Sequence, residues 1–280
     1  IVVVSASDAD DTLYGKIKYS FETPNDYFTI DNTSGRITTK TPLDHEEIQN
    51  YTLVVTAKDH GDPPSSSTVK VLVSILDLND EPPVFTMTKY TMGVNELAEF
   101  GSKVGQVSAQ DRDSVSTGEP VYSIVGPSDI NQVFSISQNS GEIFTKSALD
   151  RETTTGYSFI VRATDAADNS LTSTATVSIY LIDANDNAPI IDFPSPGNNT
   201  IHISNTDYIG QEVIRIQAHD IDASPSNQVA FYLTGSDASL EYFSLNEVSG
   251  QILTRKSLKD ITFKSYHLDI LVRDSGSPPK

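Results

Sequence analysis

The stretch YTLVVTAKD, residues 51–59, recurs as YSFIVRATD at 157–165 and as YHLDILVRD at 266–274. Each copy begins with a tyrosine, alternates apolar and polar residues, and ends on an aspartate eight residues later. Alternation with a period of two is typical of a β-strand that buries one face. The β-branched and aromatic residues of these stretches favour the same structure. The chain therefore repeats one structural unit three times.

Other landmarks keep their spacing around each strand copy. A Ser-Gly pair followed by an apolar position precedes each one, as SGRI at 34–37, SGEI at 140–143 and SGQI at 249–252. An Asp-x-Asp pair stands further upstream, and its first members, Asp8, Asp111 and Asp220, are 103 and 109 residues apart. A fixed period of this length indicates tandem domains. We expect boundaries that divide the chain into domains 1–81, 82–187 and 188–280.

The first of these domains is expected to lack its opening strand and the last its closing strand, so the sequence is expected to be part of a longer protein. Within each domain, short alternating stretches are separated by Gly, Pro, Asn and Asp, and no apolar pattern of helical period and length is present. The prediction is an all-β fold in which each domain is a two-sheet sandwich.

The composition excludes several classes of partner and of functional site. Nineteen Lys and Arg stand against 38 Asp and Glu, which gives a formal net charge of -19. Nucleic acid and anionic membrane surfaces attract basic proteins, so neither is an expected partner. With no cysteine, the chain has no disulfide, thiolate metal site or cysteine nucleophile. No apolar run approaches the ~20 residues that cross a bilayer.

The acids concentrate where one domain follows another. The two joints read DLNDEPP at 77–83 and DANDNAP at 183–189. Prolines suit such linkers because they restrict the backbone. The Asp and Asn residues suit Ca²⁺, which takes six to eight oxygen ligands from carboxylates, amides, carbonyls and water. Loops that carry Asp-x-Asp and Asp-x-Glu pairs are expected to supply further ligands.

These motifs together resemble the cadherin superfamily over the whole chain. The matching elements are LDHE at 43–46, LDRE at 149–152, Val-Asn-Glu at 94–96, the two linkers and the Asp-x-Asp loops. The resemblance implies tandem immunoglobulin-like Greek-key sandwiches with about three Ca²⁺ per complete linker. It also implies interior repeats of a long, many-repeat, non-junctional or protocadherin-like cadherin.

The resemblance assigns Ca²⁺ ligands residue by residue. At the first joint it implies side chains of Asp44, Glu46, Asp77, Asn79, Asp80, Asp111, Asp113 and Asp165, with the carbonyls of Leu78, Glu81 and Thr117. At the second joint it implies Glu96, Asp150, Glu152 and Asp186 for one ion, and Glu96, Glu152, Asp183, Asp186, Asp222 and the Ala184 carbonyl for another. A third ion is assigned Asn185, Asp220, Asp222, Asp274 and the carbonyls of Asn187 and Ser226.

The third copy departs from this pattern at its far end. Asn205 stands where the second copy has Glu96, Lys259 where it has Asp150, and Ile261 where it has Glu152. Three carboxylates are lost and one position gains a positive charge that opposes a cation. We expect the joint after the third copy to bind little or no Ca²⁺ at its first two sites and to be bent or flexible.

By resemblance, the function is calcium-dependent cell–cell adhesion, in which Ca²⁺ between repeats rigidifies an ectodomain. The segment is then extracellular and belongs to a single-pass plasma-membrane protein anchored by a segment outside this chain. Its expected partners are other cadherin ectodomains, homophilic or heterophilic. The alternative is a structural spacer or receptor-ligand module that makes no adhesive contact here. Three Asn-x-Ser/Thr triplets, at Asn32, Asn50 and Asn198, suit an exported glycoprotein.

An enzyme would have to use the paired carboxylates as general acid and base. These acids recur with the domain period, which fits ligands better than a single catalytic site. The histidines do not recur at equivalent positions, and we expect His45, in the middle of its Asp-x-Glu motif, to be exposed. The sequence therefore predicts no catalytic residue and no enzymatic activity.

Overall fold

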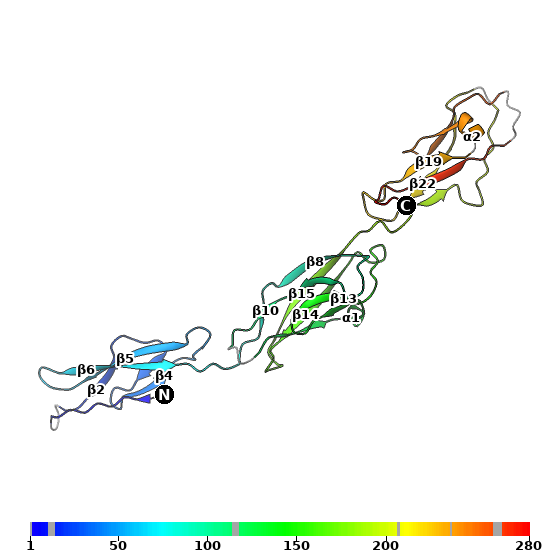
Figure 1. Cartoon of the computed structure of the whole chain (residues 1–280). Coiled ribbons are helices and arrows are strands. Elements are labelled where there is room, and N and C mark those ends of the chain that lie inside the picture. The colour runs from blue at the N-terminus through cyan, green and yellow to red at the C-terminus, as the bar shows by residue number, and fades with distance from the viewer. Residues whose placement is uncertain (1, 11–14, 114–117, 206–207, 236, 260–264) are drawn as a thin grey trace. The chain divides into compact units, whose positions relative to one another are not determined.

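The computed structural model describes residues 2–10, 15–113, 118–205, 208–235, 237–259 and 265–280 (Figure 1). The chain is all-β, as the alternation predicts, and forms two compact units. Unit 1 comprises residues 1–86, 108–123 and 162–174, and unit 2 comprises residues 87–107, 124–161 and 175–280. Among the described residues, no helix has the length and apolar character that a membrane span requires.

The first repeat of unit 1 consists of two three-stranded sheets. One has the order β2 (Lys18–Phe21), β5 (Asn50–Lys58), β6 (Ser66–Ser74), and the other has the order β1 (Val2–Val3), β4 (Arg36–Thr39), β3 (Phe28–Ile30). All of these pairings are antiparallel. The two sheets are the layers of the sandwich that the sequence predicts.

Strand β5 contains the stretch that repeats along the sequence. Its Tyr51, Leu53 and Val55 are buried, and Asn50 and Thr52 are exposed. The buried residues pack with Phe28 and Ile37 of the other sheet into one hydrophobic core. Burying apolar side chains of this size stabilises the fold by about 1.5–3 kcal/mol each. The period-two reading of this strand is confirmed.

The second repeat has the same plan. Its elements are β7 (Val84–Phe85), β8 (Lys89–Asn95), β9 (Lys103–Gln106), β10 (Ala109–Gln110), β11 (Val121–Val125), α1 (Ile130–Val133), β12 (Phe134–Ile136), β13 (Glu142–Thr145), β14 (Gly156–Thr164) and β15 (Thr172–Ile182). The sheets have the orders β11-β14-β15-β8, β12-β13-β9 and β10-β7. Strand β8 pairs parallel to β15, and this parallel pair ends next to the second linker.

The third repeat lies in unit 2. Its elements are β16 (Ile190–Phe193), β17 (Glu212–Arg215), β18 (Gln217–His219), β19 (Ala230–Thr234), α2 (Asp237–Tyr242), β20 (Phe243–Leu245), β21 (Gln251–Thr254) and β22 (Asp269–Arg273). Its sheets are β17-β21-β20, β19-β22 and β16-β18. Phe231, Phe243 and Ile252 are at the centre of its core. The helices α1 and α2 are too short to show as a helical pattern in the sequence.

The Ser-Gly landmark has a structural cause. Gly35, Gly141 and Gly250 have φ angles of 67°, 68° and 70°, a backbone conformation that favours glycine. A Cβ at Gly141 would lie 2.3 Å from the carbonyl oxygen of Val107, which is closer than real Cβ atoms approach. The close approach arises because Val107 N donates to Gly141 O at 3.0 Å. The turn thus joins two strands through its backbone.

Replacing Gly141 with alanine is expected to lower the free energy of unfolding by about 2 kcal/mol, because a strained backbone costs 1–3 kcal/mol. Urea denaturation followed by circular dichroism measures the change. Gly197→Ala is the matched control, since a Cβ there meets nothing within 4 Å. Equal stabilities of the two variants would contradict this account of the landmark.

Candidate metal centres

The predicted ligands of unit 1 gather in one place, which we call the first acidic cluster: Asp44, Glu46, Asp77, Asn79, Asp80, Asp111, Asp113 and Asp165. They come from four loops, which follow β4, β6, β10 and β14. Carboxylate oxygens of Glu46, Asp80 and Asp113 lie within 4.8 Å of one another. Asn79 Nδ2 donates to Asp165 Oδ1 at 2.9 Å, although these residues are 86 positions apart.

Buried oxygens of this cluster lack partners. Asp165 is fully buried and Asp113 is 7% exposed. Among the described residues, six buried side-chain oxygens of the cluster have no hydrogen-bond partner: both of Asp77 and one each of Asn79, Asp111, Asp113 and Asp165. Leaving buried charged oxygens unpaired is costly, and such groups normally pair or coordinate a metal. Ca²⁺ uses this donor set of carboxylate and amide oxygens.

The pKa values of the cluster report the same crowding. Burial raises the pKa of Asp113, and the negative charges of Glu46, Asp77 and Asp80 raise it further. Burial also raises the pKa of Asp111, beside Asp113 and Asp165. Like charges within a few ångströms disfavour ionisation of each other, so a cation is needed to keep them all charged.

The structure describes three of the four remaining predicted ligands of the first joint. Asp44 lines a cavity of about 220 Å³ together with Glu46 and Asp80, and its Oδ1 accepts a bond from Glu47 N at 2.9 Å. The carbonyl of Leu78 accepts a bond from Asp80 N at 3.0 Å, which leaves one lone pair for another partner. Glu81 N donates to Asp113 Oδ2 at 3.2 Å. Thr117 lies outside the described residues.

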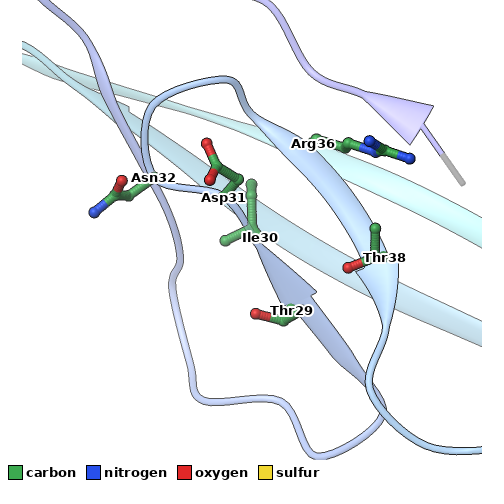
Figure 2. A pocket seen from close by; sticks show the side chains of 6 residues that line it. All are labelled: Thr29, Ile30, Asp31, Asn32, Arg36 and Thr38. Carbon is green, nitrogen blue, oxygen red and sulfur yellow. The ribbon is translucent and has the colours of Figure 1, made fainter.

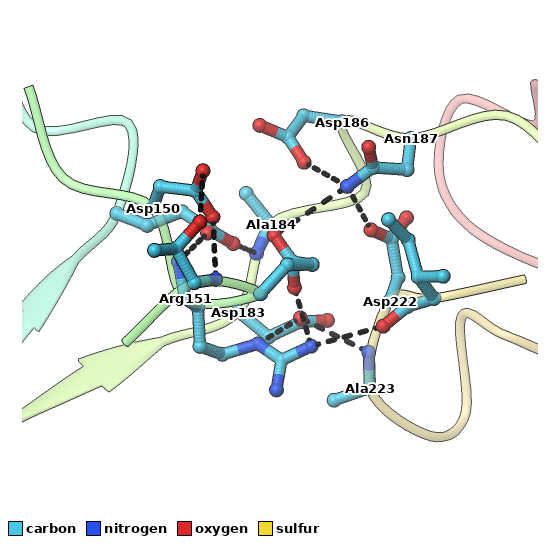
Figure 3. Close-up of polar contacts among 12 residues, drawn as sticks. Asp150, Arg151, Asp183, Ala184, Asp186, Asn187, Asp222 and Ala223 are labelled. Carbon is cyan, nitrogen blue, oxygen red and sulfur yellow. Dashed lines mark hydrogen bonds and ion pairs between the residues drawn. The ribbon is translucent and has the colours of Figure 1, made fainter. Parts of the chain in front are cut away.

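The second acidic cluster lies in unit 2 and comprises Glu96, Asp150, Glu152, Asp183, Asn185, Asp186, Asn187, Asp220, Asp222 and Asp274. Figure 3 labels five of them, Asp150, Asp183, Asp186, Asn187 and Asp222. Glu96 is 2% exposed. Its two oxygens accept bonds from Ala184 N at 2.6 Å and from Arg151 N at 2.7 Å. Glu96 therefore ties the Asp-x-Glu loop to the linker, and its carboxylate oxygens lie close to those of Asp150 and Glu152.

The linker of this cluster reaches the loops of the third repeat. Asn187 Nδ2 donates to Asp222 Oδ1 and to Asp186 Oδ1, both at 2.8 Å. Asn185 Nδ2 lies 3.3 Å from both oxygens of Asp274. Within the described part of the cluster, one buried oxygen each of Asn185, Asp220 and Asp222 lacks a hydrogen-bond partner. The residues that the resemblance assigns to the third ion thus include buried oxygens without hydrogen-bond partners, as the first acidic cluster does.

The predicted carbonyl ligands here are also near hydrogen-bond donors. Ala184 O accepts a bond from Asp186 N at 2.9 Å, and Ser226 O accepts one from Ser275 N at 3.3 Å. Burial raises the pKa of Asp186, to which the charges of Glu96 and Asp222 also contribute. Burial likewise raises the pKa of Asp220. Burial thus raises both pKa values, as it does those of Asp111 and Asp113 in the first acidic cluster.

Sequence reasoning missed the role of the middle residue of the Asp-x-Glu motif. Arg151 forms ion pairs with Glu152 and with Asp183. His45, the equivalent residue of the first cluster, was expected to be exposed, and this expectation is wrong. Its side chain is 21% exposed, and Nδ1 lies 3.1 Å from Glu46 Oε1 and 3.6 Å from Asp77 Oδ1. The sequence does contain a signal for this role. The residue between the two predicted ligands is a nitrogen-bearing side chain in both motifs, His45 in the first and Arg151 in the second.

The third repeat differs at the positions where carboxylates are missing. Asn205 Nδ2 donates to the Lys259 carbonyl at 2.9 Å. In the second repeat, by contrast, the equivalent Glu96 accepts a bond from the Asp-x-Glu loop. The same two loops are therefore connected with the donor and acceptor exchanged. Ile261 lies outside the described residues.

A larger hollow of about 500 Å³ on the first repeat contains none of the predicted ligands (Figure 2). It is lined by Thr29, Ile30, Asp31, Asn32, Arg36 and Thr38. The Asp31 carboxylate accepts bonds from Ser34 N at 2.7 Å and Thr33 N at 3.1 Å, so it serves the turn. We assign no function to this hollow.

Comparisons with known proteins agree with the fold. The chain matches the Cadherin domain over residues 1–76, 90–182 and 199–280. It therefore belongs to the cadherin family and contains three cadherin domains. The boundaries at 81 and 187 stay a prediction, although each matched range falls inside one predicted domain.

Several cadherins of the protocadherin and Fat type are similar over nearly the whole chain. Protocadherin Fat 1 of Homo sapiens is 37% identical over 281 residues, which is 99% of this chain and 6% of that protein. Protocadherin Fat 4 of Mus musculus is 33% identical over 98% of this chain and 5% of its own length. Protocadherin alpha-1 of Homo sapiens is 31% identical over all of this chain and 30% of its own. The chain thus spans a small part of these relatives.

Two solved structures share the arrangement of strands. The protocadherin gammaB7 EC3-6 cis-dimer structure has a TM-score of 0.80 at 27% identity, with 96% of this chain and 66% of that chain covered. Mouse cadherin-23 EC22-24 has a TM-score of 0.73 at 29% identity, with 100% and 87% covered. These relatives are adhesion proteins and not enzymes, so the prediction that the chain is not an enzyme is confirmed.

Replacing Asp113 with asparagine is expected to have opposite effects with and without Ca²⁺. Without metal, the change removes a buried charge among carboxylates, so the melting temperature is expected to stay or rise by a few degrees. With Ca²⁺, the variant lacks a predicted ligand, so Ca²⁺ is expected to raise its melting temperature less than that of the wild type. Differential scanning calorimetry in chelator and in Ca²⁺ measures both.

Asp129→Asn is the control, because Asp129 is exposed and belongs to neither cluster. It is expected to behave like the wild type under both conditions. A large loss of stability of Asp113→Asn in chelator would show that Asp113 has a structural role that does not depend on a cation.

Proposed function

We propose that this chain is a Ca²⁺-stiffened segment of an extracellular cadherin rod that serves calcium-dependent cell–cell adhesion. The observation that carries the proposal is a set of nine buried oxygens that, within the part of the chain that the structure describes, have no hydrogen-bond partner, six in the first acidic cluster and three in the second. Every one belongs to a residue that the cadherin motifs assign as a ligand. Ordinary acidic loops keep their carboxylates in water, where no cation is needed.

Electrostatics gives the mechanism. Unit charges ~4 Å apart repel by about 1 kcal/mol in water and by about 4 kcal/mol at an effective dielectric constant of 20. The second acidic cluster contains eight carboxylates, and about three Ca²⁺ would supply a compensating charge of about +6. Without Ca²⁺ the loops repel and the repeats flex at the linker. With Ca²⁺ the same loops are held together, and the linker becomes stiff.

The predicted ligands divide between two repeats at each linker. In the second acidic cluster, Glu96 and Glu152 come from the second repeat, whereas Asp222 and Asp274 come from the third. An ion that takes ligands from both sides couples the domains. The predicted boundaries at 81 and 187 then fall inside linkers that Ca²⁺ couples. The repeats would therefore not move freely about these positions while the ions are bound.

Ca²⁺ affinity is expected in the range of extracellular modules, ~10⁻⁴–10⁻³ M. Such sites fill outside the cell and stay empty in the cytosol, so the proposed clamp agrees with an extracellular location. The expected partners are other cadherin ectodomains, and the chain's relatives include a structure described as a cis-dimer. The membrane anchor is expected in a part of the protein outside these residues.

Chelating Ca²⁺ is expected to make the chain flexible. Small-angle X-ray scattering should give a single extended particle in 2 mM Ca²⁺, a concentration above the expected ~10⁻⁴–10⁻³ M dissociation constant, and a broad distribution of conformations in EDTA. Asp222→Asn removes a ligand that is 3% exposed and should shift the transition to higher Ca²⁺.

Glu99→Gln changes an exposed carboxylate outside both clusters and should leave the transition unchanged. Identical scattering of the wild type in Ca²⁺ and in EDTA would overturn the stiffening mechanism. Aggregation of beads coated with an ectodomain that contains these repeats tests adhesion separately. If beads fail to aggregate while scattering responds to Ca²⁺, the segment is a spacer and the adhesive part of the proposal falls.

A further inference from the structure

An imidazole faces two carboxylates in the first acidic cluster. His45 Nδ1 lies 3.1 Å from Glu46 Oε1 and 3.6 Å from Asp77 Oδ1. These three atoms lie within 4.8 Å of one another, a spacing at which one ion can contact all of them. His45 and Asp77 come from loops that follow different strands, β4 and β6, so the fold brings the three groups together.

The short contacts of His45 Nδ1 require a proton or a metal ion between the atoms. An imidazole nitrogen that presented its lone pair to the carboxylates would be repelled, whereas an Nδ1–H group or a metal-bound nitrogen would not. A proton on Nδ1 can bond to Glu46 at 3.1 Å, but 3.6 Å to Asp77 is too long for a hydrogen bond. Both oxygens of Asp77 are buried without a hydrogen-bond partner among the described residues. A proton therefore satisfies only part of the site.

A second carboxylate near that of Glu46, the one of Asp113, is also buried. Asp113 is more than nine-tenths buried, and its carboxylate lies within 4.8 Å of that of Glu46. Its Oδ1 has no hydrogen-bond partner within the described part of the chain. The negative charge that surrounds Glu46 is thus greater than one imidazolium would neutralise.

The second acidic cluster shows that this position takes a cation. Arg151 is the equivalent of His45, and its guanidinium pairs with Glu152 and Asp183, the equivalents of Glu46 and Asp77 (Figure 3). Arginine supplies a permanent positive charge there but cannot bind a metal. Histidine differs in both respects, because its charge is not permanent and its neutral imidazole is a good metal ligand.

We propose that His45, Glu46 and Asp77 form a site for a borderline divalent cation of the Zn²⁺ class, which the second acidic cluster cannot form. Imidazole nitrogen with carboxylate oxygen suits Zn²⁺, Cu²⁺ and Ni²⁺, whereas Ca²⁺ prefers oxygen alone. Three protein ligands leave a fourth position of a tetrahedral site for water. The cavity of about 220 Å³, which His45 and Glu46 line, provides access and room for that water.

The site shares Glu46 and Asp77 with the proposed Ca²⁺ ligands. Zn²⁺ and Ca²⁺ are therefore expected to compete at the first acidic cluster, so Ca²⁺ should weaken Zn²⁺ binding there. The zinc site does not depend on the adhesive function or on Ca²⁺ binding, because its three ligands are assembled by the fold alone.

Zn²⁺ titration of the metal-free chain against a chromophoric chelator tests the proposal. The wild type is expected to bind one Zn²⁺ at least tenfold more tightly than His45→Arg, which copies the second cluster. His219→Arg is the matched control, because His219 Nδ1 also contacts a carboxylate, Asp192 Oδ2 at 2.8 Å, but on an exposed surface. It should bind Zn²⁺ as the wild type does. Equal affinities of wild type and His45→Arg would overturn the proposal.

Two further measurements distinguish loss of the imidazole ligand from loss of the fold and from binding by a different histidine. Circular dichroism melts in chelator show whether His45→Arg is folded, and His45→Gln provides a neutral variant if the arginine disturbs the loop. X-ray absorption at the zinc edge should detect one imidazole in the wild type and none in His45→Gln. An imidazole signal that persists in His45→Gln would assign the zinc to another histidine and refute the site. Ca²⁺ titration of the same samples tests the proposed function independently.

Discussion

Buried carboxylates without partners are the constraint around which the linkers of this protein are organised. A carboxylate removed from water must be paired, protonated or bound to a metal, and each alternative has a different consequence for the chain. Protonation would leave the loops neutral and without a link, and pairing would need basic side chains. Arg151 supplies one such side chain in the second acidic cluster. The other buried oxygens of both clusters fit a cation that takes several ligands at once.

The sandwich is what makes this concentration of charge possible. Strands with a buried face every second residue fix the ends of the loops, as Tyr51, Leu53 and Val55 do for the loop that begins at Asp59. The glycine turns join strands through close backbone contacts. The hydrophobic cores on either side, and the cation that we propose, therefore offset the cost of gathering like charges.

Much of this was predictable from the sequence. The period-two pattern identified the long strands, and the repeated spacing identified three domains, because both follow from local chemistry. The ligand motifs identified residues that the structure does bring together, Glu46 with Asp113 in the first acidic cluster and Glu152 with Asp222 in the second. What the sequence did not show was which residues pair across loops. The contact of His45 with Asp77, 32 positions away, is one such pairing, and the motif that marks His45 does not report its partner in the other loop.

The third repeat also shows that the sequence does not reveal contacts between loops. The loss of carboxylates at Asn205 and Lys259 is readable in the sequence, but the exchanged hydrogen bond between their loops is not. A bond between neutral groups can hold two loops without metal, whereas the equivalent contact through Glu96 places a charge beside other carboxylates. Repeats of one fold can thus differ in whether their ends require a cation.

A crystal structure of this chain grown in Ca²⁺ tests the central claim most directly. The account predicts ions bound at 2.3–2.6 Å, the usual Ca²⁺–oxygen distance, to the oxygens that lack partners, including those of Asp113, Asp165 and Asp222. Clusters in which water and protein groups satisfy those oxygens at saturating Ca²⁺, with no ion bound, would contradict it.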